Sequence, residues 1–205
     1  MKIVFVQFGR DIACATMMVD TCKRLGYEVL QLSDEEAPDV PGVDEIRRSP
    51  KNAGRMLYRT RRLVEVEPPY VMLDTDMLVM RDISDGFDDS DVGLSWRPHH
   101  LVKVKHDGIY RMPYNGGLIF VRNHDFIKDC LKVMEKQTEM RQDWFGDQLA
   151  LCEVAESGKY KVRALREDCW NHAPNRLGFI DGVRIYHFKG MRKGLMPRFY
   201  EKLYG

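Results

Sequence analysis

The stretch YVMLDTDMLVM, residues 70–80, sets two aspartates one residue apart inside an otherwise apolar run. Pro68 and Pro69 precede this run, which is typical of a buried strand in a parallel sheet. Because successive side chains of a strand point to opposite faces, Asp74 and Asp76 should project from the same side. Two carboxylates that close repel each other unless they share a proton or hold a cation. Alternatively, Asp74 merely ends a strand and Asp76 begins a turn, and the Asp-Thr-Asp triplet alone does not decide between the two.

The composition excludes several classes of protein. With 205 residues, of which 44% are hydrophobic, the chain can bury a core and is most simply one domain, residues 1–205. Its 32 basic and 31 acidic side chains create no overall field that would draw it to nucleic acid or to an anionic membrane. No apolar run is long enough to span a bilayer, and no signal-peptide profile precedes the first strand pattern. Five scattered cysteines without metal-type spacing fit a reducing compartment, so we expect a soluble, cytoplasmic protein.

Strand and helix patterns alternate along the chain. KIVFVQF (residues 2–8) and YEVLQL (27–32) predict buried strands, and the helical spacing of apolar residues between them predicts a helix that ends before Gly26. A right-handed crossover would make these two strands parallel neighbours. Further strands are expected at 114–121 and 184–188. Further helices are expected over about 51–66 with Ser49 and Pro50 at its start, after Asn123, and from Asp143 to about Ala155.

This alternation predicts an α/β domain with a mainly parallel central sheet, whose strand carboxyl ends form the ligand crevice. Three more motifs fall at or near such ends: NGG at 115–117, FGDQ at 145–148 and HFKGMRK at 187–193. Each has an ordinary alternative, because the glycines could only make a turn, Asp147 and Gln148 could lie on the surface, and His187 could be a core histidine. The basic, glycine-containing loop after His187 nevertheless suits the binding of a polyphosphate.

Taken in order, the four motifs resemble those of nucleotide-sugar glycosyltransferases with the GT-A fold, in particular family 8, which includes glycogenins and bacterial galactosyltransferases. That family carries an Asp-x-Asp after a strand, an Asn-x-Gly segment, an Asp-Gln pair that opens a helix, and a late His-x-x-Gly-x-x-Lys. The resemblance covers about the last two thirds of the chain. Leu149 stands where the family often has a third acid, and Gly194 and Leu195 stand where it often has Pro-Trp. These departures bear on substrate identity more than on the metal site.

The resemblance implies a metal-dependent transfer of a hexose. Asp74, Asp76 and His187 would hold a divalent cation, Mn²⁺ or Mg²⁺, and the imidazole favours Mn²⁺. The donor is expected to be a UDP-hexose, UDP-glucose or UDP-galactose, and Lys193 would stabilise the charge that develops on the leaving diphosphate. Further contacts with the nucleotide sugar are expected from Gln7, Phe8, Arg55, Arg59, Thr75, Asn115, Gly116, Gly117 and Gly190.

The resemblance also implies that transfer retains the α configuration of the donor. Gln148 is the candidate group on the far face of the sugar, and an amide is too weak a nucleophile to form a stable glycosyl ester. A short-lived oxocarbenium ion, met by the acceptor on the face that the diphosphate leaves, is therefore expected, with the departing phosphate oxygen as base. Asp147 would orient sugar or acceptor hydroxyls.

Residues 47–62 hold seven basic side chains and no acid. An exposed helix face is one interpretation of this run. Arg55 and Arg59 lie one helical turn apart and share a face, and similar enzymes place a basic residue of this helix on the donor, for which Arg59 is the first choice and Arg55 the second. The remaining cations could meet an anionic acceptor, nucleic acid included, although a glycan or a protein is the more expected acceptor.

The segment SWRPHHLVKVKHDGIYRM, residues 95–112, holds three of the six histidines, His99, His100 and His106. We interpret it as a mobile flap near the acceptor rather than as a second metal site.

Three other functions fit the sequence less well. A haloacid-dehalogenase-type phosphatase would need Thr or Val at the position of Leu78, and a sugar-nucleotide pyrophosphorylase would need a glycine-rich basic signature where this chain has QFGRD, residues 7–11. A degenerate transferase fold that serves as a binding module is the third, and the intact set of candidate metal ligands argues against it.

Overall fold

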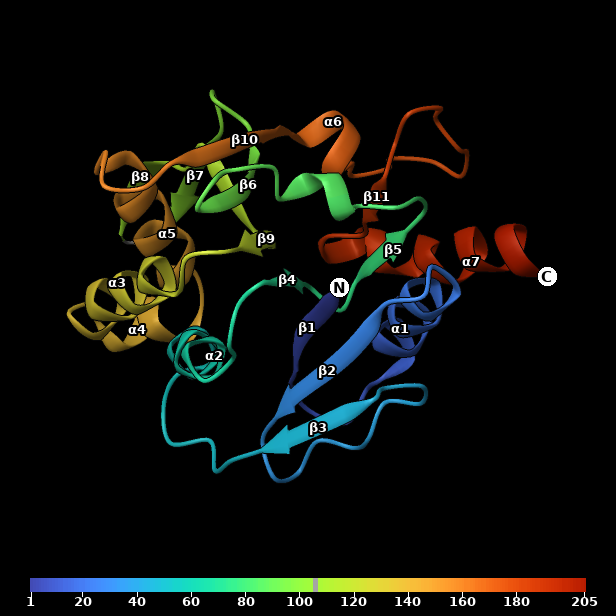
Figure 1. The fold of residues 1–205 in the computed structure, drawn as a ribbon, viewed down its shortest axis with the longest axis horizontal. Coiled ribbons are helices and arrows are strands. Elements are labelled where there is room, and N and C mark those ends of the chain that lie inside the picture. The colour runs from blue at the N-terminus through green and yellow to red at the C-terminus, as the bar shows by residue number, and fades with distance from the viewer. Residues whose placement is uncertain (105–106) are drawn as a thin grey trace.

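The computed structural model describes residues 1–104 and 107–205. Its centre is a seven-stranded sheet in the order β10-β6-β9-β4-β1-β2-β3 (Figure 1). Its strand pairs are parallel except those of β9, which runs antiparallel to both β4 and β6. The predicted α/β architecture with a mainly parallel sheet is therefore confirmed. The strands of this sheet are β1 (Lys2–Gln7), β2 (Glu28–Ser33), β3 (Glu45–Arg48), β4 (Tyr70–Leu73), β6 (Val92–Trp96), β9 (Tyr114–Val121) and β10 (Val162–Arg166).

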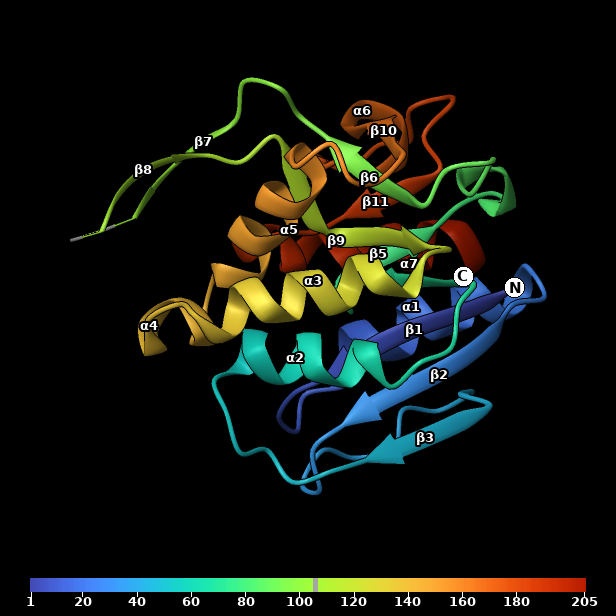
Figure 2. The ribbon, with the colours of Figure 1, turned by 60° about the vertical axis from the view of Figure 1, so that its left-hand side comes forward.

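Both faces of the sheet are covered by helices, as the apolar runs of its strands require. In β1, Ile3 and Phe5 point into the core shared with α1 (Ala13–Arg24) and α7 (Met196–Tyr204), whereas Val4 and Val6 point into the opposite core. That second core is covered by α2 (Arg55–Val64), α3 (His124–Glu135) and α5 (Gly146–Glu156), and Figure 2 shows α2 and α3 side by side.

The predicted opening unit is confirmed. β1, α1 and β2 follow one another, the two strands are parallel neighbours, and the helix is followed by Gly26 with a φ of +76°. The helix cap at Asn123 is confirmed as well, because its side chain accepts a hydrogen bond from the N–H of Asp125 at the start of α3.

The run 70–80 forms two strands rather than the single strand predicted. β4 ends at Leu73, and β5 (Met77–Val79) pairs antiparallel with β11 (Ile185–His187) in a separate two-stranded sheet. The N–H of Asp74 still donates to the carbonyl of Gly117, at 2.9 Å, whereas the carbonyl of Asp76 accepts from the N–H of Phe188, at 2.8 Å. The aspartates thus stand where the chain passes from the central sheet to the small one, at the carboxyl end of β4.

Two predicted helix starts are wrong. Ser49 and Pro50 precede α2 without capping it, because the N–H of Ser49 extends the pairing of β3 with β2 by donating to Ser33. Asp143 does not cap α5 but ends the short α4 (Glu139–Asp143). Its carboxylate accepts from the N–H of Arg55 at 3.0 Å and so caps the first turn of α2, a contact between segments 88 residues apart.

The remaining elements lie outside the central sheet. β7 (Leu101–Val104) and β8 (Gly108–Arg111) form a hairpin that projects from the body (Figure 2). His106, part of the predicted flap, lies outside the described residues. The other short elements are η1 (Ser84–Gly86), α6 (Glu167–Trp170) and η2 (Gly190–Leu195). In the described part of the chain, every helix is too short or too polar to traverse a bilayer.

Candidate active site

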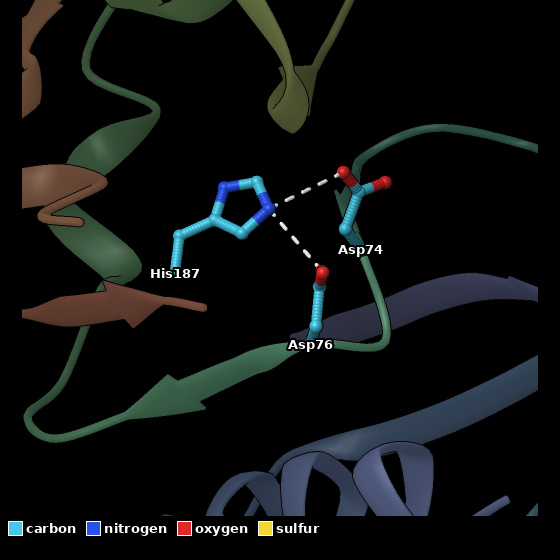
Figure 3. Close-up of side chains that lie close together, drawn as sticks. All are labelled: Asp74, Asp76 and His187. Atoms are coloured by element: carbon cyan, nitrogen blue, oxygen red, sulfur yellow. Dashed lines mark ion pairs between the residues drawn. The ribbon is translucent and has the colours of Figure 1, made fainter. Parts of the chain in front are cut away.

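Three candidate metal ligands from two distant segments converge. Asp74 and Asp76 follow β4, and His187 ends β11, whose neighbour β5 begins directly after Asp76 (Figure 3). The Nε2 atom of His187 lies 3.6 Å from Asp74 Oδ2 and 3.2 Å from Asp76 Oδ1, and one potential ligand atom from each of the three residues lies within 4.8 Å of the others. Neighbouring ligands of an octahedral ion with bonds of about 2.1 Å stand about 3 Å apart. The three groups are therefore spaced as one divalent cation requires.

The imidazole of His187 is held from behind by Asn171. Its Nδ1 lies 2.7 Å from Asn171 Oδ1, and the amide nitrogen of Asn171 donates to Ser95 Oγ at 2.9 Å and to Asn115 Oδ1 at 2.7 Å. These donor bonds fix the orientation of the Asn171 amide, so its oxygen accepts a hydrogen bond from the Nδ1–H of His187. The lone pair of Nε2 then faces the two carboxylates, which is the tautomer that a metal ligand needs. Asn171 is fully buried, and no sequence motif had pointed to it.

Gly117 gives the metal ligands their space. A Cβ atom at this position would stand 2.6 Å from Cε1 of His187 and 2.7 Å from Oδ2 of Asp74. Both distances are far below van der Waals contact, so any side chain would displace a candidate ligand. The second glycine of the NGG motif is therefore required by the close approach of β9 to the three ligands, rather than by a turn.

Arg59 joins three parts of the site. Its guanidinium donates to Asp74 Oδ1 at 2.7 Å and to the carbonyl of Gly116 at 2.7 Å, and lies 2.9 Å from Asp147 Oδ2. Burial alone would lower the pKa of Arg59, but the carboxylates of Asp147 and Asp74 raise it above its ordinary value. Arg59 is thus a permanent cation between two acids.

Asp147 and Gln148 open α5, as predicted for an Asp-Gln pair at a helix start. Burial raises the pKa of the Asp147 carboxyl, Arg59 opposes this effect, and the negative charge of Asp74 adds to it. The side-chain oxygen of Gln148 accepts from Asn115 Nδ2 at 3.1 Å. Because Asn115 also bonds Asn171, one chain of amides connects Gln148 to the imidazole of His187.

Asp76 has a second cationic neighbour in Lys193, whose Nζ lies 3.3 Å from Asp76 Oδ2. Burial would raise the pKa of the Asp76 carboxyl, but His187 and Lys193 lower it below its ordinary value. Lys193 belongs to η2 and its side chain is 55% exposed, which leaves it free to turn toward a ligand. The carboxylate of Asp76 therefore stays ionised, as a metal ligand must be.

A cavity of about 470 Å³ opens over these residues, a size in the range of small-molecule sites. It is lined by many of the predicted residues, namely Phe8, Arg59, Asp74, Thr75, Asp76, Asn115, Gly116, Gly117, Asp147, Gln148 and Lys193. The apolar part of its wall consists of Met56, Val102, Met112, Trp144 and Phe145 together with strand residues. Val102 and Met112 belong to the predicted flap and Phe145 to the FGDQ motif, whereas no sequence signal had pointed to Met56.

Three predicted donor contacts lie away from the cavity wall. Gln7 is buried, and its amide donates to the carbonyls of Phe8, Gly9 and Asp11, so it braces the loop after β1. Arg55 lies 3.5 Å from Asp143 on the surface. Gly190 starts η2 with a φ of +58°, a left-handed conformation that favours glycine.

The basic run 47–62 is largely neutralised within the molecule. Each of its six arginines has a carboxylate within ion-pair distance, and Lys51 stands over the ring of Phe8, 6.0 Å from its centroid. The pairs are Arg47–Glu45, Arg48–Asp39, Arg55–Asp143, Arg59–Asp74, Arg61–Glu135 and Arg62–Glu65. This surface consequently lacks the stripe of free positive charge that a nucleic acid would follow.

Comparisons with known proteins identify the fold. No family model and no curated protein sequence matches the chain. The structure of a galactosyltransferase, LgtC, in complex with donor and acceptor sugar analogues superposes with a TM-score of 0.59 at 15% identity, over 100% of this chain and 97% of that one. The glycosyltransferase GlyE of Streptococcus pneumoniae TIGR4 superposes with a TM-score of 0.61 at 14% identity, over 97% of this chain and 60% of that one. The chain thus has the GT-A fold of these glycosyltransferases, as predicted.

The same fold also occurs with another chemistry. The CTP:phosphocholine cytidylyltransferase LicC of Streptococcus pneumoniae superposes with a TM-score of 0.53 at 11% identity, over 98% of both chains. At such identities the likeness shows the fold alone, so the reaction must be inferred from the site.

Proposed function

We propose that this protein is a metal-dependent glycosyltransferase that moves a hexose from a nucleoside-diphosphate sugar, UDP-glucose or UDP-galactose, to a glycan or protein acceptor, with residues 1–205 acting as one domain. The observation that carries the proposal is the convergence of His187 with Asp74 and Asp76, two residues that line a cavity. The same cavity also presents Lys193 and Arg59. Two carboxylates and an imidazole suit Mn²⁺, with Mg²⁺ as the second choice. A bound ion would neutralise the diphosphate and favour its departure as a leaving group.

Several residues around the candidate metal ligands would each contact a different part of the donor. Phe8 offers an aromatic wall at the end of β1 for the base, and Thr75 presents a hydroxyl between the two aspartates. Lys193 can exchange its contact with Asp76 for the phosphates, because it is exposed and stands on the loop that follows β11. A cation at this place stabilises negative charge where it grows as the sugar–phosphate bond breaks.

On the sugar side, the site presents an amide and a carboxylate already bonded to protein groups. The Gln148 oxygen accepts from Asn115, and Asp147 is paired with Arg59, so neither is free to act as a strong nucleophile. This supports transfer with retention through a short-lived oxocarbenium ion, in which the leaving phosphate oxygen takes the proton of the acceptor. Asp147 would then orient hydroxyl groups.

A hydrolysis assay tests the proposal without an acceptor. The purified protein is incubated with UDP-glucose or UDP-galactose, and UDP release is measured with Mn²⁺, with Mg²⁺ and with a chelator. We expect metal-dependent release that Asp76→Asn and His187→Ala abolish. Asp181→Asn, which removes an exposed carboxylate paired with Arg81 on the surface, serves as the matched control and should retain the activity. Equal release with the chelator, or full activity in both ligand variants, would contradict the proposal.

The same assay separates the alternatives. A binding module would bind UDP and metal without releasing UDP from the sugar nucleotide. A nucleotidyltransferase, a chemistry known on this fold, would instead cut within the diphosphate and require a nucleoside triphosphate as its forward substrate. A transferase acting on nucleic acid is disfavoured by the internal ion pairs of the basic run.

A further inference from the structure

One tryptophan on the cavity wall is exposed although its segment is bonded to the elements on both sides. Trp144 directly follows α4, lines the cavity, and is 58% exposed. Before it, Asp143 accepts from the N–H of Arg55 on α2, at 3.0 Å. Arg141 donates to both carboxylate oxygens of Asp107 in the hairpin, at 2.9 and 3.0 Å. The indole therefore stands between α2 and the hairpin, on a segment that is tied to each of them.

The indole ring also has a defined aromatic neighbour. It meets the ring of Phe145 edge to face, with centroids 5.5 Å apart and an angle of 77° between the planes. Phe145 is buried and packs in turn against Tyr110 of β8, with centroids 6.0 Å apart. Trp144 is thus supported from the protein side, while more than half of its surface is open. A rigid aromatic surface on a cavity wall offers a large contact to a ligand at a small entropic cost.

Trp144 lies next to the groups assigned to the transferred sugar. Asp147 and Gln148 follow it closely in the chain, at the start of α5, and line the same cavity. The diphosphate is assigned to other segments, because the candidate metal ligands end β4 and β11 and Lys193 belongs to η2. The base is assigned to Phe8 after β1, a strand that β4 separates from β9. The wall at Trp144 is therefore available to the acceptor.

This wall favours an uncharged ligand with an apolar face. In the described part of the cavity wall, the neighbours of the indole are the apolar residues Met56, Val102, Met112 and Phe145. The carboxylate of Asp147 is already paired with Arg59, at 2.9 Å. A charged group placed here would lose water without gaining a free counter-charge, which is costly. A pyranose, in contrast, has carbon–hydrogen faces that can lie on an indole and hydroxyl groups at its rim that can reach polar side chains.

We propose that Trp144 is the platform on which a neutral pyranose of the acceptor stacks, with one of its hydroxyl groups directed at the transferred sugar. This inference rests on the proposed function and deepens it, because it selects a neutral sugar over a charged or a protein acceptor and assigns the residue that contacts it. Trp144 takes no part in making or breaking bonds. It sets the orientation of the acceptor, and with it the acceptor specificity.

The three tryptophans of the chain make this contact measurable. Protein that is isotope-labelled in its tryptophans gives three indole N–H signals in NMR. Trp96 and Trp170 are not among the residues that line the cavity and serve as internal references. With UDP and Mg²⁺ at saturation, methyl β-glucoside, methyl β-galactoside, methyl glucuronide and N-acetyltyrosinamide are titrated separately. At least one of the two neutral hexosides should shift the Trp144 signal with millimolar affinity, and the other two compounds should leave it in place.

Substitutions separate stacking from a general effect on the segment. Trp144→Ala should weaken hexoside binding, followed on backbone amide signals, about tenfold. Trp144→Phe keeps a smaller aromatic face and should recover most of that affinity. Met140→Ala is the matched control, because Met140 is an exposed apolar side chain of the same helix and is not among the residues that line the cavity. It should bind the hexoside as the wild type does.

The outcomes distinguish this inference from the proposed function. If neither hexoside shifts the Trp144 signal, or if Trp144→Ala binds the hexoside as tightly as the wild type, the inference is overturned, while UDP binding in the same samples leaves the proposed function standing. It is also overturned if the glucuronide or the tyrosine amide binds in place of the hexosides. A loss of UDP affinity in Trp144→Ala as large as the loss of hexoside affinity would assign the indole to the base and refute the acceptor platform. Wild-type protein that binds no UDP would overturn the proposed function, and the acceptor assignment with it.

Discussion

Replacing Asn171 by alanine should weaken metal binding although Asn171 is not itself a candidate ligand. The substitution removes the acceptor 2.7 Å from Nδ1 of His187 and the donors to Ser95 and Asn115. Without its acceptor, the imidazole can rotate or change tautomer, so Nε2 no longer points steadily at the carboxylates. Loss of a hydrogen-bond partner behind a metal-ligating histidine typically costs about 10- to 100-fold in metal affinity. We expect a decrease of that size for Asn171→Ala.

The same substitution should also lower stability. Three buried polar groups lose a partner, and each such loss costs about 1–3 kcal/mol when it is not relieved. Asn115 Oδ1 keeps its bond from the N–H of Gly117, at 3.2 Å, and a water can enter the space of the lost side chain. A net loss of about 3 kcal/mol is therefore reasonable, against a total of about 5–15 kcal/mol for a typical domain. The variant should still fold at moderate temperature.

Calorimetric titration of Mn²⁺ in the presence of UDP measures the affinity, and thermal unfolding measures stability. Gln31→Ala is the matched control, because Gln31 is a fully buried amide that bonds Pro38 and Val40 on the opposite part of the sheet. It should lose similar stability and keep the affinity for Mn²⁺. If folded Asn171→Ala binds Mn²⁺ as tightly as the wild type and Gln31→Ala, Asn171 does not hold the imidazole and the interpretation is wrong.

Three other substitutions probe separate features. Gly117→Ala should abolish Mn²⁺-linked UDP binding in calorimetry, because the new Cβ atom would lie 2.6 Å from Cε1 of His187. Gly178→Ala is the control and should leave this binding unchanged, because no atom lies within 4 Å of the Cβ position at Gly178. Gln148→Ala should lower turnover without abolishing it, and NMR of the first-formed anomer should show retention; a β-linked product would point to Asp147 as a general base. Hydrogen bonds from Tyr27, which has the larger effect, and from Ser84 lower the pKa of Asp82 to about 2. These bonds therefore stabilise the folded protein above pH 3.8, and their contribution is lost as the pH falls toward 2. Since Asp82 is exposed, we expect only about 1 kcal/mol, and acid unfolding of Asp82→Asn should lack this component.

The sequence contained enough information for the mainly parallel α/β architecture and for the convergence of the candidate ligands, whereas the strands β3, β6 and β10 were not predicted. Strand carboxyl ends meet at one edge, so motifs placed after strands come together even when many residues separate them. Asp74 and His187 are 113 positions apart, and the short β5–β11 pairing brings them together. The pairing could not be predicted, because the polar triplet at residues 74–76 interrupts the apolar run 70–80 without indicating that the chain passes to another sheet there.

What the sequence could not reveal depends on contacts between distant segments. Ser49-Pro50 and Asp143 are good local cap signals, but the first is drawn into the β2–β3 pairing and the second caps α2 instead of α5. Asn171 belongs to no motif, and its role follows only from what surrounds it in the fold. Local propensity thus located the elements better than it located their ends or their buried polar partners.

The charges at the site favour joint binding of metal and donor. Three carboxylates, those of Asp74, Asp76 and Asp147, face the two cations Arg59 and Lys193, which leaves one net negative charge. A divalent ion alone would reverse this balance, and a diphosphate alone would add two negative charges beside three carboxylates. When the ion and the diphosphate bind together, the net charge of the site stays the same. Bound ion should therefore raise the affinity for the diphosphate, and bound diphosphate should raise the affinity for the ion by the same factor. Lys193, whose side chain is 55% exposed, would complete that exchange by leaving Asp76 for the phosphates.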